Sequence, residues 1–256
     1  MKLLAFDTST DVMSIAVSRD DGAAAGLWQQ QAAGGAQAST GLIAAVLELM
    51  RQSGMALAEL DAICFGCGPG SFTGLRTACA VAQGLAFGAQ VPVLPVHTLL
   101  AIAEDARHNA LADVAHGQVD ALLDARMDEI YTARYAFATS PAGVLWSERD
   151  AAHLRKPESV GLEAATLLPQ VPALAAAGNV FAVYGARLSA LDAQVLRIPA
   201  LPQAAAMLRL APRLLAQGQA VPAEQALPLY VRDKVAQTTA ERAAIKAALA
   251  AASQAP

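Results

Sequence analysis

The sequence predicts an α/β protein with two lobes that join near residues 97–117. Three observations support this expectation. The chain opens with short apolar runs separated by polar turns at 8–11 and 20–22, which is typical of an antiparallel meander. The run 68–76, GPGSFTGLR, follows an apolar segment and precedes a helical one, so it predicts a strand–turn–helix unit. The pattern of strands begins again near Gln118, as expected for a second lobe.

The first lobe is expected to continue from the meander into alternating helices and strands. Ser39 and Thr40 are in position to cap a helix with one apolar stripe, and Gly54 follows its end. Ser71 is in the N-cap position of the next helix, and Gly88 is expected to stop it. The expected strands are 2–6, 12–17, 27–31, 60–65 and 91–96, and the expected helices are 39–53, 72–87 and 98–107.

The second lobe is expected to repeat strands and helices in a smaller unit. Pro212 should kink or break its last helix, because proline lacks an N–H and its ring clashes with the preceding turn. Thr238 to Glu241 resembles a capping box before an alanine-rich tail. The expected elements are strands at 119–123 and 129–137 around a turn at 124–128, a helix at 157–168, a strand at 174–177, a short helix after Gly178 and Asn179, a helix at 203–217 and a short segment at 229–232. The chain therefore divides into a first lobe at 1–100, a second lobe at 101–235 and a tail at 236–256.

Composition restricts the class of protein. The chain has 256 residues, of which 55% are hydrophobic and 16% charged, and its net charge is −4. Strong binding to nucleic acid by this chain alone is therefore not expected. No signal peptide or apolar stretch of about 18 residues is visible, so we expect a cytoplasmic protein without membrane contact. Cys64, Cys67 and Cys79 are expected to be free thiols, and the first two should point in different directions.

The run 68–76 has two interpretations. The backbone N–H groups at the helix start after Ser71 can hold an anion, or the helix can simply be well capped and packed. Arg76 lies one turn into that helix and can meet a phosphate or pair with Asp7 or Asp11. Asp7 itself is expected to bond the N–H of Ser9 or of the next residue, with a ligand role as the alternative. Both interpretations remain open at this stage.

Four segments together resemble the bacterial TsaB (YeaZ) family. They are DTST at 7–10, GPGSFTGLR at 68–76, DARMDEIY at 124–131 and PLYVR at 228–232, and the resemblance spans about residues 1–235. It implies a two-lobed actin-like fold, the ASKHA architecture of sugar kinases, Hsp70 and actin. It also implies a part in making the threonylcarbamoyl modification of adenosine 37 in tRNAs that read ANN codons. In that family the protein is a non-catalytic partner that stabilises and activates the paralogous transferase TsaD, alongside the ATPase TsaE.

The resemblance also implies an interface. TsaB-like proteins pair with TsaD, or with a second copy of themselves, through helices of the first lobe, and tRNA is reached only through the complex. From the sequence alone, an apolar stripe is ordinarily the core face of a helix; with the resemblance, part of this surface becomes a contact for a related subunit. The expected interface residues are Leu42, Ile43, Val46, Leu47, Met50, Thr73, Thr77, Ala80 and Gly84. No cofactor is expected for the isolated chain, and ATP or ADP with Mg²⁺ is expected only in the complex.

Two rival functions follow from the same superfamily. An actin-like ATPase or small-molecule kinase needs a phosphate-binding hairpin in each lobe, but the turn 124–128 contains no glycine and Arg126 fills its space. The residues expected to contact a nucleotide or anion are Asp7, Ser9, Thr10, Ser71 and Arg76. A metallopeptidase-type site needs two histidines four residues apart, and no pair among the four histidines has that spacing. We therefore assign no catalytic and no metal-binding residue.

Overall fold

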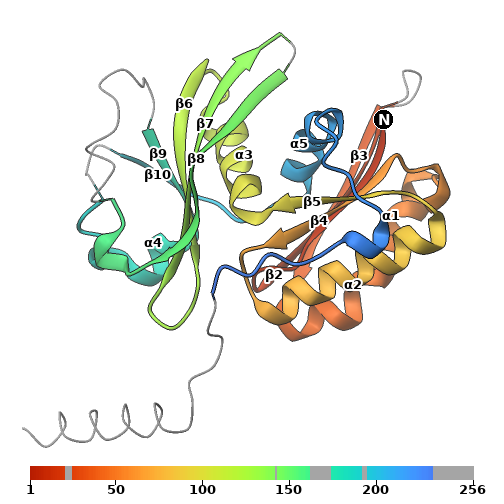
Figure 1. The fold of residues 1–256 in the computed structure, drawn as a ribbon, viewed down its shortest axis with the longest axis horizontal. Coiled ribbons are helices and arrows are strands. Elements are labelled where there is room, and N and C mark those ends of the chain that lie inside the picture. Colours follow the sequence, from red (N-terminus) through yellow and green to blue (C-terminus); the bar gives the residue numbers. More distant parts are fainter. Residues whose placement is uncertain (21–24, 142, 162–173, 192–194, 233–256) are drawn as a thin grey trace, which may run out of the picture.

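The computed structural model describes residues 1–20, 25–141, 143–161, 174–191 and 195–232, and Figure 1 shows their arrangement. Each lobe contains a five-stranded mixed sheet. The order in the first lobe is β3-β2-β1-β4-β5, and in the second it is β10-β9-β6-β7-β8. The strands of the first sheet are β1 (Lys2–Asp7), β2 (Val12–Asp20), β3 (Ala25–Ala33), β4 (Ala62–Gly68) and β5 (Val93–His97). Those of the second are β6 (His116–Asp124), β7 (Ile130–Ser140), β8 (Gly143–Arg155), β9 (Leu174–Gly178) and β10 (Leu196–Pro199).

The two sheets have the same topology. In each, the first three strands form an antiparallel meander, and the last two run parallel to the first strand on its other side. The expected meander and the expected restart of the pattern near Gln118 are therefore confirmed. A sheet repeated in this way in two lobes is the two-lobed actin-like fold.

Helices cover both faces of the first sheet. Leu4 and Phe6 of β1 pack against α1 and α2, whereas Leu3 and Ala5 pack in the cluster that contains α5. Residues 3–6 of this strand are all apolar, because both of its faces are buried. The helix α3 packs on the second sheet and beside α5. The helices are α1 (Ala38–Ser53), α2 (Phe72–Ala89), α3 (Thr98–Ala110), α4 (Val180–Tyr184) and α5 (Ala204–Ala216). The helix α5 lies on the first sheet, so the chain returns to the first lobe after β10.

The helix starts are only partly as predicted. Ser71 is the N-cap of α2, and its Oγ accepts a hydrogen bond from the N–H of Gly74. The prediction that Ser39 or Thr40 caps α1 is wrong, because α1 begins at Ala38 and Gln37 is in the N-cap position without a side-chain cap. The hydroxyl of Thr40 instead donates to the carbonyl of Gln37 at 3.0 Å, inside the first turn.

Two predicted helix breaks also differ. Gly88 does not end α2, since the helix continues to Ala89 and Gln90 takes the left-handed conformation with φ of 56°. Pro212 does not break α5, which continues to Ala216. Its position, exposed on the helix, keeps the proline ring away from the core. Gly54 does end α1, with φ of 68°.

Some elements of the second lobe were not predicted. The strands β8 and β10 were missed. The described start of the helix expected at 157–168 is a single 3-10 turn over Pro157–Ser159, and residues 162–168 of the expected helix lie outside the described residues. The capping box at 238–241 also lies outside the described residues. The strand β8 was missed because its sequence, GVLWSERDAAHLR, has few consecutive apolar residues, and half of its residues are exposed.

Cys64 and Cys67 point to opposite faces of β4, as predicted. Cys64 belongs to the cluster with α5 and Cys67 to the cluster with α1 and α2, and all three cysteines are free and buried. Burial raises the pKa of Cys64 and of Cys67 to about 12, so both remain protonated thiols at neutral pH. They are core residues. Among the helices of the described residues, none is long and apolar enough to cross a membrane.

The start of α2 is in direct contact with the turn after β1. The N–H of Ser71 donates to the carbonyl of Ser9 at 2.8 Å, and the hydroxyl of Thr8 donates to the carbonyl of Gly74 at 2.7 Å. A Cβ atom on Gly74 would lie 1.8 Å from the carbonyl oxygen of Thr8. Glycine is therefore required at this position because of backbone-to-backbone contact.

We expect Gly74→Ala to lower the free energy of unfolding by more than about 2 kcal/mol, because the added methyl group forces the helix away from the turn. Urea denaturation followed by circular dichroism measures this change. Gly84→Ala is the matched control in the same helix. Its Cβ meets nothing within 4 Å, so the change should raise stability by up to about 1 kcal/mol. Equal effects of the two variants would contradict the close contact.

Candidate functional site: the cleft between the lobes and the outer face of two helices

A cleft of about 290 Å³ lies between the lobes. Its first-lobe side is the turn after β1 together with the start of α2, and its second-lobe side is the turn 124–128. The C-terminal segment 229–232 forms a further wall. Of the residues expected to contact a nucleotide or anion, Ser9, Thr10 and Ser71 line this cleft. Asp7 and Arg76 are not among its lining residues, and their contact with a nucleotide or anion stays a prediction.

Asp7 lies under the first-lobe turn and is completely buried. Its Oδ1 accepts hydrogen bonds from the N–H of Ser9 at 2.8 Å and from the hydroxyl of Ser9 at 2.6 Å. The expected turn-forming role is therefore confirmed for Ser9. The other oxygen, Oδ2, has no hydrogen-bond partner among the described residues. Burial raises the pKa of Asp7 from 3.8 to about 6, although the bonds from Ser9 favour the ionised form.

Arg76 pairs with neither Asp7 nor Asp11. Its guanidinium lies 3.9 Å from the centre of the Phe72 ring, and its Nε donates to the hydroxyl of Tyr230 at 3.0 Å. The Tyr230 ring in turn packs on Phe72, with 5.3 Å between the ring centres. Arg76 therefore fastens the C-terminal segment to α2.

The second-lobe turn has an unusual backbone. Arg126, Met127 and Asp128 have φ values of 59°, 53° and 64°, so three successive residues other than glycine are left-handed. Each such residue costs about 1–2 kcal/mol. The sequence analysis noted the missing glycine but did not predict that the turn would adopt this conformation nonetheless. Arg126 extends across the cleft and forms an ion pair with Asp11 of the first lobe.

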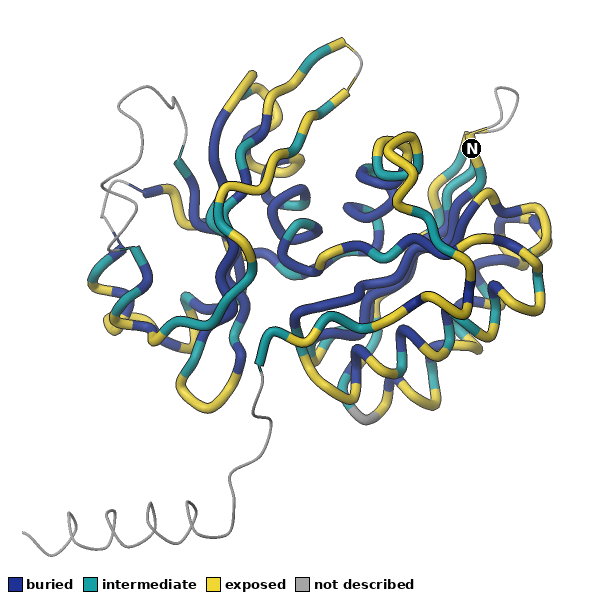
Figure 2. The backbone as a smooth tube through the Cα atoms, viewed as in Figure 1, coloured by how far each residue is buried: buried dark blue, intermediate teal, exposed yellow. Residues whose placement is uncertain are grey.

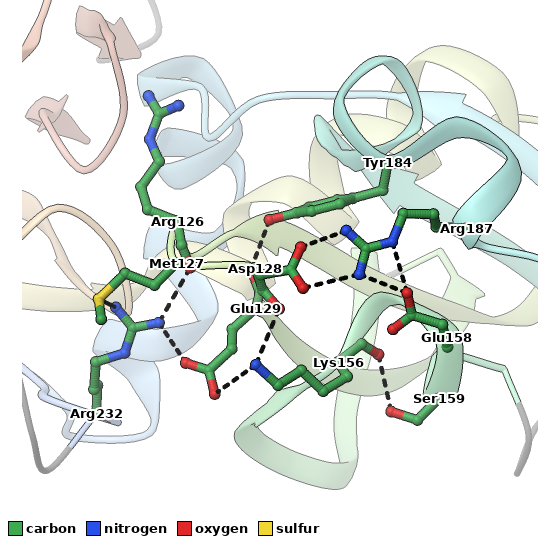
Figure 3. Close-up of polar contacts among 10 residues, drawn as sticks. All are labelled: Arg126, Met127, Asp128, Glu129, Lys156, Glu158, Ser159, Tyr184, Arg187 and Arg232. Atoms are coloured by element: carbon green, nitrogen blue, oxygen red, sulfur yellow. Dashed lines mark hydrogen bonds and ion pairs between the residues drawn. The ribbon is translucent and has the colours of Figure 1, made fainter. Parts of the chain in front are cut away.

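Side chains from several elements hold this turn, as Figure 3 shows. The guanidinium of Arg187 pairs with the carboxylate of Asp128 and, through Nε, with Glu158 at 2.6 Å. These hydrogen bonds lower the pKa of Asp128. The hydroxyl of Tyr184 lies 2.8 Å from Oδ1 of Asp124 and can donate to it. Side chains bonded to Asp124 before the left-handed residues and to Asp128 at their end thus stabilise this conformation.

The segment 226–232 ties the two lobes together, and Figure 1 shows it passing from the first lobe to the second. In the first lobe, the N–H of Leu229 donates to the carbonyl of Cys67 at 2.7 Å. In the second, Nη2 of Arg232 donates to Oε2 of Glu129 at 2.6 Å and to the carbonyl of Arg126 at 3.4 Å. The PLYVR motif at 228–232 is therefore a strap across the cleft. This role was not predicted, because one short motif gives no sign of which partners it meets.

Four charged side chains line the cleft. Its lining carries two carboxylates, Asp11 and Asp124, and two guanidinium groups, Arg126 and Arg232, so the charges balance. The buried carboxylate of Asp7 is turned away from the cleft. Among the described residues, no three His, Cys, Asp or Glu side chains gather as they would around a metal ion.

The outer face of α1 and α2 is the second candidate site. The structure divides the predicted stripe on α1, because Leu42, Val46 and Met50 are buried in the core, whereas Ile43 and Leu47 are 49% and 50% exposed. The prediction that the three buried residues contact a partner is therefore corrected. On α2, Thr73, Ala80 and Gly84 are exposed, Thr77 is half-buried and Phe87 is 78% exposed. Figure 2 shows exposed segments along the outer side of both helices.

Comparisons with known proteins agree on one group of relatives. The family model described as TsaD, tRNA N6-adenosine threonylcarbamoyltransferase, matches residues 35–240. The tRNA threonylcarbamoyladenosine biosynthesis protein TsaB of Escherichia coli is 32% identical over 92% of this chain and 96% of its own. The TsaB protein of Haemophilus influenzae is 39% identical over 51% of this chain and 52% of its own. The solved structure of YeaZ from Pseudomonas aeruginosa has a TM-score of 0.72 and 33% identity, and the match covers 90% of this chain and 99% of that one.

We expect Asp7→Asn to remove one component of the pH dependence of stability. Because the folded pKa of about 6 lies above 3.8, the folded state binds this proton more tightly than the unfolded state. The wild type should therefore gain up to about 3 kcal/mol relative to the variant as the pH falls from 7 to 4. Urea unfolding at a series of pH values measures the difference. Curves of stability against pH that run parallel for the wild type and Asp7→Asn would contradict the burial effect.

Proposed function

The chain belongs to the TsaB family, and from this premise we propose that it is a non-catalytic scaffold of the machinery that makes N6-threonylcarbamoyladenosine in tRNA. Its direct partner in this proposal is a TsaD-type transferase, which it stabilises and activates. A TsaE-type ATPase and the tRNA join only through the complex, in the cytoplasm, and ATP or ADP with Mg²⁺ enters only there. A homodimer through the same face is the expected competing state.

The observation that carries the proposal is the apolar outer face of α1 and α2. Ile43 and Leu47 are one turn apart on α1, and Phe87 near the end of α2 is more exposed than any other large apolar side chain of the described residues. None of them contributes much to the core of the lobe. Gly84 is exposed on α2 three residues before Phe87, and the space next to its Cα is open. Small residues on a helix let a second helix approach closely, so this face suits helix packing by another subunit.

The cleft supports the non-catalytic part of the proposal. Several hydrogen-bond donors of its first-lobe wall are used within the chain, since the N–H and hydroxyl of Ser9 donate to Asp7 and the N–H of Ser71 donates to the carbonyl of Ser9. The second-lobe turn uses side chains to fix its own backbone. Both turns thus serve the fold. The experiment that tests this part is an assay of tRNA modification with the purified chain alone and with the transferase, and modification by the chain alone would contradict the proposal.

We expect Leu47→Glu to prevent complex formation with the TsaD-type transferase of the same organism, because a carboxylate would be buried in an apolar contact. Size-exclusion chromatography with light scattering, on each protein alone and on the mixture, measures this. Leu196→Glu is the matched control, since Leu196 is 48% exposed but lies on β10 in the second lobe. The control should pair normally. Normal pairing by folded Leu47→Glu would overturn the interface.

Gly84→Arg tests the close approach of the partner helix. The arginine side chain has room in the free chain, so the variant should fold. Its free energy of unfolding should lie within about 0.5 kcal/mol of that of the Gly84→Ala variant. In the complex it should occupy the space of the partner and weaken binding at least tenfold, whereas Gly84→Ala should bind nearly as the wild type does. Isothermal calorimetry against the transferase gives both affinities. Equal affinities for the two variants would show that α2 is not in the contact.

A further inference from the structure

We propose that a second cavity, distinct from the cleft, binds a small organic anion with an apolar body. This cavity has a volume of about 530 Å³ and shares no lining residue with the cleft. It lies among α3, α5 and the β7–β8 hairpin, which Figure 1 shows on the side of the molecule away from the strap. The volume is in the range of small-molecule pockets, which extends from about 300 to 1,000 Å³. The proposal is independent of the scaffold function.

The apolar walls of this cavity are held in place. Leu100, Val144, Leu210 and Leu214 line it together with Trp146. The indole of Trp146 packs at 90° to the ring of Tyr135, with 6.3 Å between ring centres, and its Nε1 donates to Oε2 of Glu104 at 3.1 Å. An indole fixed at both its ring and its N–H offers a preformed flat surface for an apolar ligand body.

Two buried polar groups of lining residues lack hydrogen-bond partners among the described residues. Tyr135 is 2% exposed, and its hydroxyl is unbonded. The Nη2 of Arg209 is also buried and donates no hydrogen bond, although it lies 3.7 Å from Oδ1 of Asp105. Buried polar groups are rarely left unbonded, so each such group needs an explanation. Both atoms are closed off from the open space of the cavity, so a ligand reaches them only when these side chains move.

The charge of the lining favours an anion. Arg107, Arg209 and Arg213 line the cavity with Glu104 and Glu148, so the balance is three positive against two negative groups. The carboxylate of Glu104 is already bonded by both Arg107 and Arg209. The side chain of Arg213 is exposed and makes no hydrogen bond or ion pair within the described part of the chain. An anionic group at the rim near Arg213, with the apolar body against Trp146, matches this distribution.

The test uses 8-anilinonaphthalene-1-sulfonate, which joins an aromatic body to a sulfonate. The chain has two tryptophans, so Trp28→Phe leaves Trp146 as the reporter. We expect saturable binding with one site per chain, quenching of Trp146 and energy transfer to the bound dye. Saturable fluorescence without transfer from Trp146, removed by Leu47→Glu, would place the dye on the α1–α2 face and overturn the proposal.

Two variants in the Trp28→Phe background, one in the lining and one outside it, test the anion contact. Arg213→Gln should weaken binding about threefold to tenfold, whereas Arg149→Gln, an equal charge change at an exposed residue of β8 outside the lining, should leave it unchanged. If Arg213→Gln and Arg149→Gln bind the dye equally, the cavity does not select an anion and the proposal fails.

Discussion

The contact between the start of α2 and the turn after β1 determines both candidate surfaces of the first lobe. Gly74 brings the helix backbone against Thr8, and the bond from Ser71 to Ser9 fixes its direction. With its start fixed in this way, α2 turns Ala78, Ala82 and Ala86 into the core, and the opposite side of the helix remains exposed. The same first turn forms one wall of the cleft. A small backbone contact thus places the proposed partner face and the cleft relative to each other.

The second lobe depends on a different constraint, the left-handed turn at 126–128. Its backbone is unfavourable in isolation and is over-determined by its neighbours, which is the condition under which such a conformation persists. Arg187 holds it through Asp128, and Arg232 holds it through the carbonyl of Arg126. Because Arg232 belongs to the strap, the conformation of this turn and the joining of the two lobes are stabilised by the same side chain.

The sequence predicted the parts of this structure that depend on local signals. The meander, the helix after Ser71 and the repeat of the sheet follow from apolar runs and turn residues. The edge strand β8 could not be predicted in that way, because its pairing with β7 rather than its own composition makes it a strand. The pairs Arg126–Asp11 and Arg232–Glu129 join residues more than 100 positions apart, and periodicity carries no information at that distance. Arg76 was predicted to meet a phosphate or an acidic residue, whereas it contacts the ring of Phe72 in its own helix and the hydroxyl of Tyr230, which lies 154 positions away.

The apolar residues of α1 divide between the core and the proposed interface. The buried set Leu42, Val46, Leu49 and Met50 recurs at intervals of three and four, so it already forms a complete core stripe about 100° wide. Ile43 and Leu47 lie next to that stripe, about 100° around the helix, and the core does not need them. Apolar residues in excess of the core stripe are therefore the part of the pattern that indicates a partner. The stripe as a whole does not, because its larger part is the interior of the lobe.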